Sequence, residues 1–306
     1  MPTHDVLFHE YALSPFSEKI RRIFGFKKMA FRSVEQPMWM PKPQLTPLTG
    51  GYRRIPVLQI GADVYCDTAL IARHLEERQP APAIFPAGQE AAARLVAAWA
   101  DRQLFQACVP LVFGALADLM PPELLADRQQ MRPDLNVESL RAAAPHCRST
   151  LHAALATLDA GLATSDFVLG SAFSLADAAI YHCLWFARNA PECTAMLDSA
   201  RHVTAWMARL NAMGPGDRSP MEAAEALAIA AAASPAATPA TYAADPHGLT
   251  PGQTIGISSD DLPSDVFRGA VVTSGPDEIV IRRDDPALGV LAIHFPRAGY
   301  LVHAGG

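Results

Sequence analysis

Over the first eighty residues, the spacing of hydrophobic positions changes between that of strands and that of helices. A short apolar run at 5–8 is followed by apolar residues at helical spacing over 20–24, with basic residues between them. Two further strands are indicated at 55–60 and 64–66, and a helix at 67–75. The predicted order is therefore strand, helix, a variable stretch, two strands and a helix.

The pattern changes twice further along the chain. After a proline-rich linker at 79–83, alanine- and leucine-rich stretches with helical spacing extend over 89–212. We expect breaks at the prolines in this stretch: Pro110, Pro121, Pro122, Pro133, Pro145 and Pro191. Beyond a second linker at 234–239, short apolar runs separated by Gly, Pro and Asp predict strands. These runs are 254–257, 269–273, 278–282, 290–295 and 300–302.

These patterns predict three parts. The first is an α/β domain over 1–80, the second an all-α domain over 88–233, and the third a small, mostly β module over 247–306. A length of 306 residues fits more than one domain, because single domains average about 150 residues.

Composition and charge narrow the class of protein. Half of the residues are hydrophobic and 18% are charged, which excludes global disorder. A net charge of -6 gives no attraction to phosphate backbones or anionic membranes, so we expect no nucleic-acid or membrane partner. The N-terminus lacks the pattern of a secretory signal, and the apolar run at 223–233 is too short to span a bilayer, so a cytoplasmic location is expected.

Cysteine and histidine give no sign of a redox or metal centre. The five cysteines are scattered without a CxxC pair and are expected to be reduced and structural. The ten histidines form neither HxH nor HExxH, so no metal site is expected.

The first candidate for chemistry is the pair of hydroxyls, Ser14 and Ser17, where the first strand meets the first helix. A helix N-terminus stabilises anions through free amides and its dipole, and a hydroxyl there can donate to a thiolate. Ser14 could thereby lower the pKa of a substrate thiol without acting as a nucleophile. The alternative is plain helix capping, for which serine is a preferred residue.

Two further candidates follow along the chain. If Ile55-Pro56 is a cis peptide, the backbone of Ile55 is exposed to an extended peptide, whereas a trans proline at a strand edge is the ordinary alternative. Asp67 could bind an ammonium group, and Thr68 with the first helical amides a carboxylate. Together they suit the end of an α-amino acid, although either residue could simply cap the helix.

These three signals, in this order, resemble the glutathione transferase family over roughly the first 215 residues. The resemblance implies a thioredoxin-like first domain followed by an all-helical domain. It also implies that Ser14 stabilises the glutathione thiolate, that Ile55 and Pro56 bind the cysteinyl unit, and that Asp67 and Thr68 hold the γ-glutamyl group. Ser17 ranks second and Tyr11 third as the hydroxyl that contacts sulfur. Arg54 is expected to assist the peptide's carboxylates, unless it belongs to a solvated surface pair with Arg53.

The family also carries a buried helix start that matches Ser174-Leu175-Ala176-Asp177, a capping box with a role in folding. The resemblance implies an electrophile pocket, for which Trp99, Gln103, Phe105 and Phe113 are candidates. Core packing is the alternative role for these side chains.

The C-terminal module lies outside the usual extent of the family. Its cluster from His294 to Tyr300 could bind a partner or cover the active site. The alternative is a small β module that merely packs on the helical domain or on a neighbouring subunit. The function expected is that of a homodimeric detoxification enzyme, in which glutathione as co-substrate adds to a hydrophobic electrophile. The alternatives are a glutathione-binding regulatory protein without catalysis and a homodimeric structural protein.

Overall fold

The computed structural model describes residues 5–132 and 136–304, which form two compact units. Unit 1 comprises the chain up to Ser17, the segment Ala30–His74 and the chain from Arg218 onward. Unit 2 comprises Glu18–Met29 and Leu75–Asp217. The domain boundaries expected from the sequence remain a prediction, since these units are defined by contacts and each contains separate stretches of chain.

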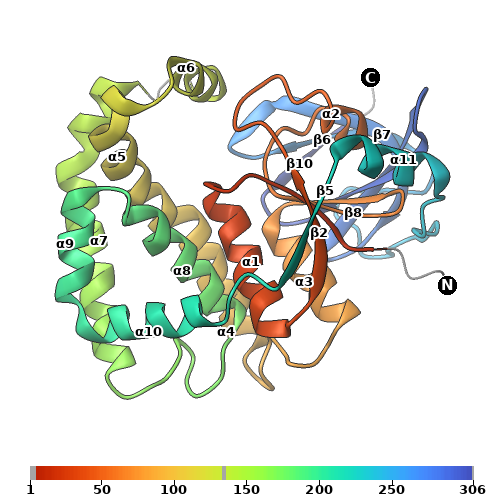
Figure 1. Ribbon diagram of the computed structural model, residues 1–306. Helices are drawn as coiled ribbons and strands as arrows, with labels where there is room; N and C mark the ends of the chain where they lie inside the picture. Colours follow the sequence, from red (N-terminus) through yellow and green to blue (C-terminus); the bar gives the residue numbers. More distant parts are fainter. Residues whose placement is uncertain (1–4, 133–135, 305–306) are drawn as a thin grey trace. The chain divides into compact units, whose positions relative to one another are not determined.

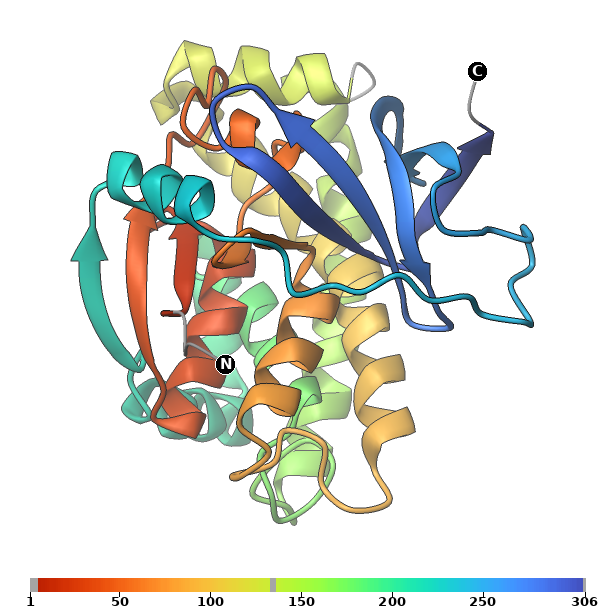
Figure 2. The same cartoon turned by 90° about the vertical axis from the view of Figure 1, so that its right-hand side faces the viewer.

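The strands form one ten-stranded sheet, in the order β10-β6-β7-β8-β9-β4-β3-β1-β2-β5. Their bounds are β1 Leu7–Glu10, β2 Ala30–Glu35, β3 Val57–Ile60, β4 Asp63–Cys66, β5 Asp217–Met221, β6 Thr254–Ser259, β7 Leu262–Ser274, β8 Glu278–Asp285, β9 Gly289–Pro296 and β10 Tyr300–Ala304. Each of the five apolar runs predicted in the C-terminal module lies within one of the strands β6 to β10. Figure 2 shows the C-terminal strands in blue as long, curved ribbons.

The N-terminal strands have the thioredoxin-like arrangement. Strand β1 pairs in parallel with β2 and antiparallel with β3, and β3 forms a hairpin with β4. The helix α1 (Pro15–Lys27) connects β1 to β2, and α3 (Thr68–Arg78) follows β4. Strand β2 and the short helix α2 (Thr46–Thr49) lie in the stretch for which the sequence predicted no element. Polar residues at Arg32 and Ser33 interrupt the apolar pattern there.

The C-terminal strands continue the N-terminal sheet. Strand β9 pairs in parallel with β4, and Tyr65 lies opposite His294 in the register. One hydrophobic cluster includes Val57 and Val64 from the first part of the chain and Ile281 and Ile293 from the last. Because both segments bury apolar side chains in this cluster, the module shares its core with the N-terminal strands.

Helix α11 (Ala223–Ala232) belongs to unit 1 and packs on β2 and β9. Its buried residues are Ala223, Ala226 and Ala230, at helical spacing on one face. Small side chains allow this helix to approach the sheet closely. Figure 1 shows α11 beside the strands of unit 1.

Unit 2 is helical. Besides most of α1, it contains α4 Glu90–Trp99, the π-helix η1 Ala100–Leu104, α5 Phe105–Leu116, the 3-10 helix η2 Ala117–Leu119, α6 Pro122–Met131, α7 Val137–Leu162, α8 Leu175–Ala187, α9 Pro191–Ser199 and α10 Arg201–Ala212. Helix α8 is buried along almost its whole length and forms the centre of the unit. None of the described helices combines the length and apolar character needed to cross a membrane.

The prediction of helix breaks was partly wrong. Pro122 and Pro191 are the first residues of α6 and α9, as expected for residues that lack an amide donor. In contrast, Pro110 lies inside α5 and Pro145 inside α7. These two helices pack against each other, and their tertiary contacts offset the hydrogen bond lost at each proline. Pro133 lies outside the described residues.

Candidate functional site

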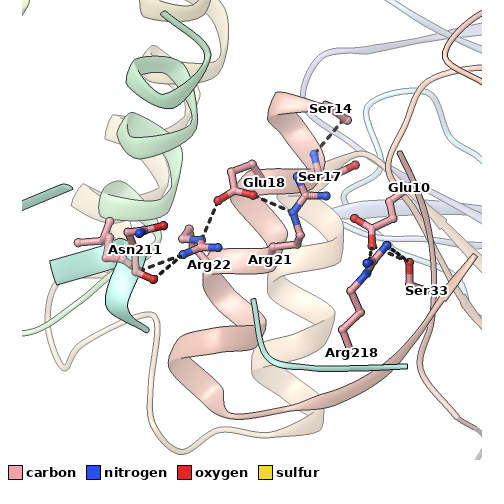
Figure 3. Close-up of polar contacts among 10 residues, drawn as sticks. Glu10, Ser14, Ser17, Glu18, Arg21, Arg22, Ser33, Asn211 and Arg218 are labelled. Carbon is pink, nitrogen blue, oxygen red and sulfur yellow. Dashed lines mark hydrogen bonds and ion pairs between the residues drawn. The ribbon is translucent and has the colours of Figure 1, made fainter. Parts of the chain in front are cut away.

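Ser14 lies at the start of α1, directly before its first residue. Its Oγ accepts a hydrogen bond of 3.1 Å from the backbone N–H of Ser17 (Figure 3). Ser14 therefore caps the helix. Capping uses Oγ as an acceptor, and no acceptor for its hydroxyl hydrogen is found within 5–132 and 136–304. The same hydroxyl thus retains the donor that a thiolate requires.

Ser17 lies three residues further along, in the first turn of α1. Its side chain is fully buried, and its Oγ has no hydrogen-bond partner in the described part of the chain. A buried hydroxyl without a partner is unusual in a folded protein. Ser14 is itself only 1% exposed, although the neighbouring Leu13 is 61% exposed. Tyr11 is half-buried, with Lys42 Nζ 5.8 Å from its ring centroid.

A buried carboxylate supports the end of β1 just before this loop. Glu10 Oε1 accepts a hydrogen bond of 2.7 Å from Ser33 Oγ and forms an ion pair of 3.0 Å with Arg218 Nε. Arg218 Nη2 also donates to Ser33 Oγ (Figure 3). The three side chains form one polar cluster that links β1, β2 and β5. Arg218 compensates the charge that Glu10 brings into the sheet, and this fixes the strand that leads to Ser14.

The Ile55-Pro56 peptide bond is cis. Next to it, Arg54 Nη2 donates to Asp261 Oδ1 at 2.7 Å. Burial would raise the pKa of Asp261, but the Arg54 guanidinium, together with hydrogen bonds from Ser259 and the backbone, outweighs burial and lowers that pKa below its ordinary value. The residue expected to assist a peptide carboxylate is therefore already paired with a carboxylate of the C-terminal strands.

Asp67 and Thr68 lie at the start of α3. Asp67 has a positive φ of 76° and its Oδ1 accepts a hydrogen bond of 2.9 Å from the backbone N–H of Ala69. A non-glycine residue with this backbone conformation is uncommon and concentrates at functional sites. Thr68 is buried. Asp67 thus caps the helix, as the simpler interpretation predicted, in a conformation that capping alone does not require.

A tyrosine of the C-terminal strands also reaches Asp67. Tyr300 Oη lies 3.4 Å from Asp67 Oδ2 and 3.4 Å from Tyr52 Oη. Burial raises the pKa of both phenols, with further contributions from Asp67, so both remain neutral hydroxyls at neutral pH.

Asp261 and Tyr300 therefore join the residues predicted from the sequence, Arg54 and Asp67. Sequence reasoning singled out the cluster that ends at Tyr300 but did not connect it with Asp67, and it missed Asp261. The only sequence signal for Asp261 is a pair of acidic residues in a turn between two predicted strands.

The residues proposed for an electrophile pocket belong to unit 2, where two half-buried ones pack on the same aromatic ring. The rings of Phe105 and Phe113 both pack on Phe186, with centroid distances of 5.4 and 6.2 Å. Trp99 and Gln103 are exposed. For the two phenylalanines, packing is therefore the role that the structure shows.

The capping box predicted at Ser174 and Asp177 opens α8. Asp177 Oδ2 accepts from both the backbone N–H and the hydroxyl of Ser174, while Oδ1 accepts from Val168 N and Trp206 Nε1, all at 2.9 Å. In the described residues, no cluster of three or more His, Cys, Asp or Glu side chains is placed to hold a metal ion.

Two family models match the chain. Residues 8–83 match the N-terminal domain of glutathione S-transferase, and residues 140–209 match its C-terminal domain. A crystal structure of a GST-like protein from Pseudomonas syringae is 38% identical, with a TM-score of 0.79 over 99% of this chain and 100% of that one. This chain belongs to the glutathione S-transferase family. The predicted fold class is confirmed, and the C-terminal strands lie within the region that the Pseudomonas protein shares.

Other solved structures match a smaller share of this chain. The glutathione S-transferase CsGST63524 of Ceriporiopsis subvermispora, solved in complex with glutathione, is 16% identical, with a TM-score of 0.57 over 68% of this chain and 97% of that one. FzlA from C. crescentus is 23% identical, with a TM-score of 0.51 over 77% and 96% of the two chains. At these identities the likeness shows the fold alone. No curated protein matches the chain.

Membership of the glutathione S-transferase family supports glutathione binding and transferase-like activity in general terms.

Proposed function

We propose that this protein is a glutathione transferase that stabilises the thiolate of glutathione and adds it to a hydrophobic, electrophilic small molecule. The observation that carries the proposal is Ser14 at the N-terminus of α1, with a hydroxyl donor that capping leaves available. Glutathione is a co-substrate in this reaction. Its γ-glutamyl group is assigned to Asp67 and Thr68, and its cysteinyl unit to Ile55 and Pro56.

The chemistry is a shift in the pKa of the bound thiol. A free thiol with a pKa near 8.5 is only a few per cent ionised at neutral pH, and the thiolate is the nucleophile. The hydrogen bond from Ser14 and the positive end of the α1 dipole both favour the charged form. The thiolate sulfur then forms a bond to the electrophilic carbon. In a conjugation by addition, the electron pair of the attacked double bond moves onto the electrophile and takes up a proton. In an addition-elimination the leaving group departs with its bonding electron pair, and in an isomerisation the C–S bond breaks again and releases glutathione. This chemistry suits detoxification, and five free, buried cysteines suit the reducing cytoplasm.

The test is titration of bound glutathione by thiolate absorbance, combined with a panel of electrophiles. In the wild-type protein we expect a thiol pKa clearly below that of free glutathione. Ser14→Ala should return the pKa toward the free value and lower kcat by about 10²-fold, the usual effect of removing one stabilising donor. Ser17→Ala is the matched control, because it removes a hydroxyl from the same helical turn. If Ser17→Ala has the larger effect, Ser17 is the sulfur ligand.

A second candidate function is glutathione binding without turnover, and the burial of Ser14 favours it. At 1% exposure, Ser14 presents almost no surface to the sulfur atom of a ligand. A regulatory protein of this kind would bind glutathione with its thiol pKa unchanged and would react with no electrophile. The titration above therefore separates the two functions.

We also propose that the protein is a homodimer. Leu95 and Trp99 lie one turn apart on α4 and are 72% and 37% exposed, so one face of this helix presents apolar surface. Leu95→Glu should shift the sedimentation of the protein toward the monomer, whereas Arg94→Glu, next to it in the sequence, should have less effect. A monomeric wild-type protein would contradict this assignment.

A further inference from the structure

One end of the C-terminal module contacts Arg54 and Asp67, the two charged residues expected to bind the ends of glutathione. Ser259 is the register partner of Tyr300, and the backbone N–H of Asp260 donates to Gly299 O at 3.0 Å. The turn after β6 and the turn before β10 are thereby joined. The first turn presents Asp261 to Arg54, and the second presents Tyr300 to Asp67.

Asp261 already supplies a carboxylate to Arg54, the residue expected to assist the carboxylates of the peptide. The two side chains form an ion pair of 2.7 Å, with 29% of Arg54 and 46% of Asp261 exposed. Because Asp67 and Thr68 are assigned to the amino-acid end of glutathione, the carboxylate left for Arg54 is that of the glycyl unit. The glycyl carboxylate and the Asp261 carboxylate are both negatively charged, and both would pair with the Arg54 guanidinium.

We infer that Asp261 is a specificity-determining residue, which competes with the glycyl carboxylate for Arg54 and thereby reduces the preference of the site for a free carboxylate. The inference rests on the proposed glutathione site. It extends the substrate class to thiol peptides whose C-terminal end is uncharged, as in an ester or an amide. An uncharged C-terminal end forms no ion pair with Arg54, so Asp261 does not reduce the affinity of the site for such ligands.

The test compares glutathione with its glycyl monoethyl ester by calorimetric titration of the full chain under reducing conditions. Asp261→Asn removes the charge and keeps the shape of the side chain. We expect it to bind glutathione about two- to fivefold more tightly, the range that a partly exposed ion pair allows, while binding of the ester changes less. Asp260→Asn, which removes the same charge one residue earlier in the turn, should leave both affinities unchanged.

The same substitution in an Arg54→Gln variant tests whether Asp261 affects glutathione binding through Arg54. In Arg54→Gln, the further change Asp261→Asn should alter glutathione binding by less than it does in the wild-type background. Unchanged melting temperatures establish that the variants are folded. If Asp261→Asn weakens glutathione binding or leaves it unchanged, the inference is overturned and the proposed function stands. If neither ligand binds the wild-type protein or any variant, the proposed glutathione site fails together with the inference.

Discussion

The hydroxyl of Tyr300 lies 3.4 Å from a carboxylate oxygen of Asp67, although 233 residues separate the two in the sequence. The ring of Tyr300 belongs to the shared hydrophobic core and packs on Phe295, with centroids 5.6 Å apart. Packing in the core thus fixes the ring of Tyr300, and the fixed ring places the hydroxyl next to Asp67. Because this hydroxyl is neutral, it orients the carboxylate without opposing the charge of a ligand.

Removing that hydroxyl should weaken glutathione binding. Tyr300→Phe keeps the ring in the core and deletes only the donor to Asp67. We expect the Kd for glutathione to rise about two- to fivefold, the usual value of one hydrogen bond, with little change in melting temperature. Tyr52→Phe is the matched control, since it removes the other hydroxyl of the pair. Tighter binding by Tyr300→Phe would show that its hydroxyl competes with the ligand.

The contact between β9 and β4 should depend on pH through His294. Its Nε2 lies 3.0 Å from Asp63 Oδ1, and its Nδ1 lies 3.7 Å from Glu278 Oε2. Burial would lower the pKa of His294, but these two carboxylates outweigh burial and raise it above its ordinary value of 6.5. The stabilisation is therefore complete below about pH 6.5 and is lost as the pH rises through the higher pKa of the folded state.

Urea unfolding at about pH 6 and pH 8 tests this dependence. The difference in unfolding free energy between the wild-type protein and His294→Gln should be larger at the lower pH, by about 1 kcal/mol. His152→Gln, at an exposed position on α7, serves as the control. An equal difference at both pH values would rule out protonation of His294 as a source of stability.

Asp177 should matter for folding far more than for binding. The Asp177→Ala variant leaves four donors of Ser174, Val168 and Trp206 without an acceptor in a fully buried site. We expect the free energy of unfolding to fall by about 3 kcal/mol or more, while glutathione affinity at a temperature where the variant is folded stays close to that of the wild type. An unchanged melting temperature in a thermal scan would contradict this role.

A buried ion pair links α1 to η1 within unit 2. Lys19 is fully buried, and its Nζ lies 2.5 Å from Oδ2 of Asp101, whose side chain is 17% exposed. Lys19→Met should lower the free energy of unfolding by about 3 kcal/mol, because Asp101 then remains buried without its counter-charge. Adding Asp101→Leu should recover most of the loss in chemical denaturation. A double variant no more stable than Lys19→Met would show that the lost packing of Lys19, and not its charge, is responsible.

Local patterns sufficed to predict much of this protein, because they reflect interactions between residues close in sequence. The runs that became β6 to β10 alternate with turn residues, and the capping box at Ser174 and Asp177 spans a single helical turn. Where local patterns conflicted with tertiary packing, the prediction failed. Pro110 and Pro145 lie inside helices, and β2 forms despite its polar residues because β1 and β5 lie on either side of it.

The sequence by itself determined the order of most elements, apart from β2 and α2. It also determined the candidates Ser14, Ile55-Pro56 and Asp67-Thr68, since each is a short motif at the end of a helix or strand. Only the tertiary structure decided that the C-terminal strands would extend the N-terminal sheet through β4 and β9. It also decided the partners of Arg54 and Asp67, which are 207 and 233 residues away. No local preference selects such pairs, because they form only when the shared core has brought the two ends of the chain together.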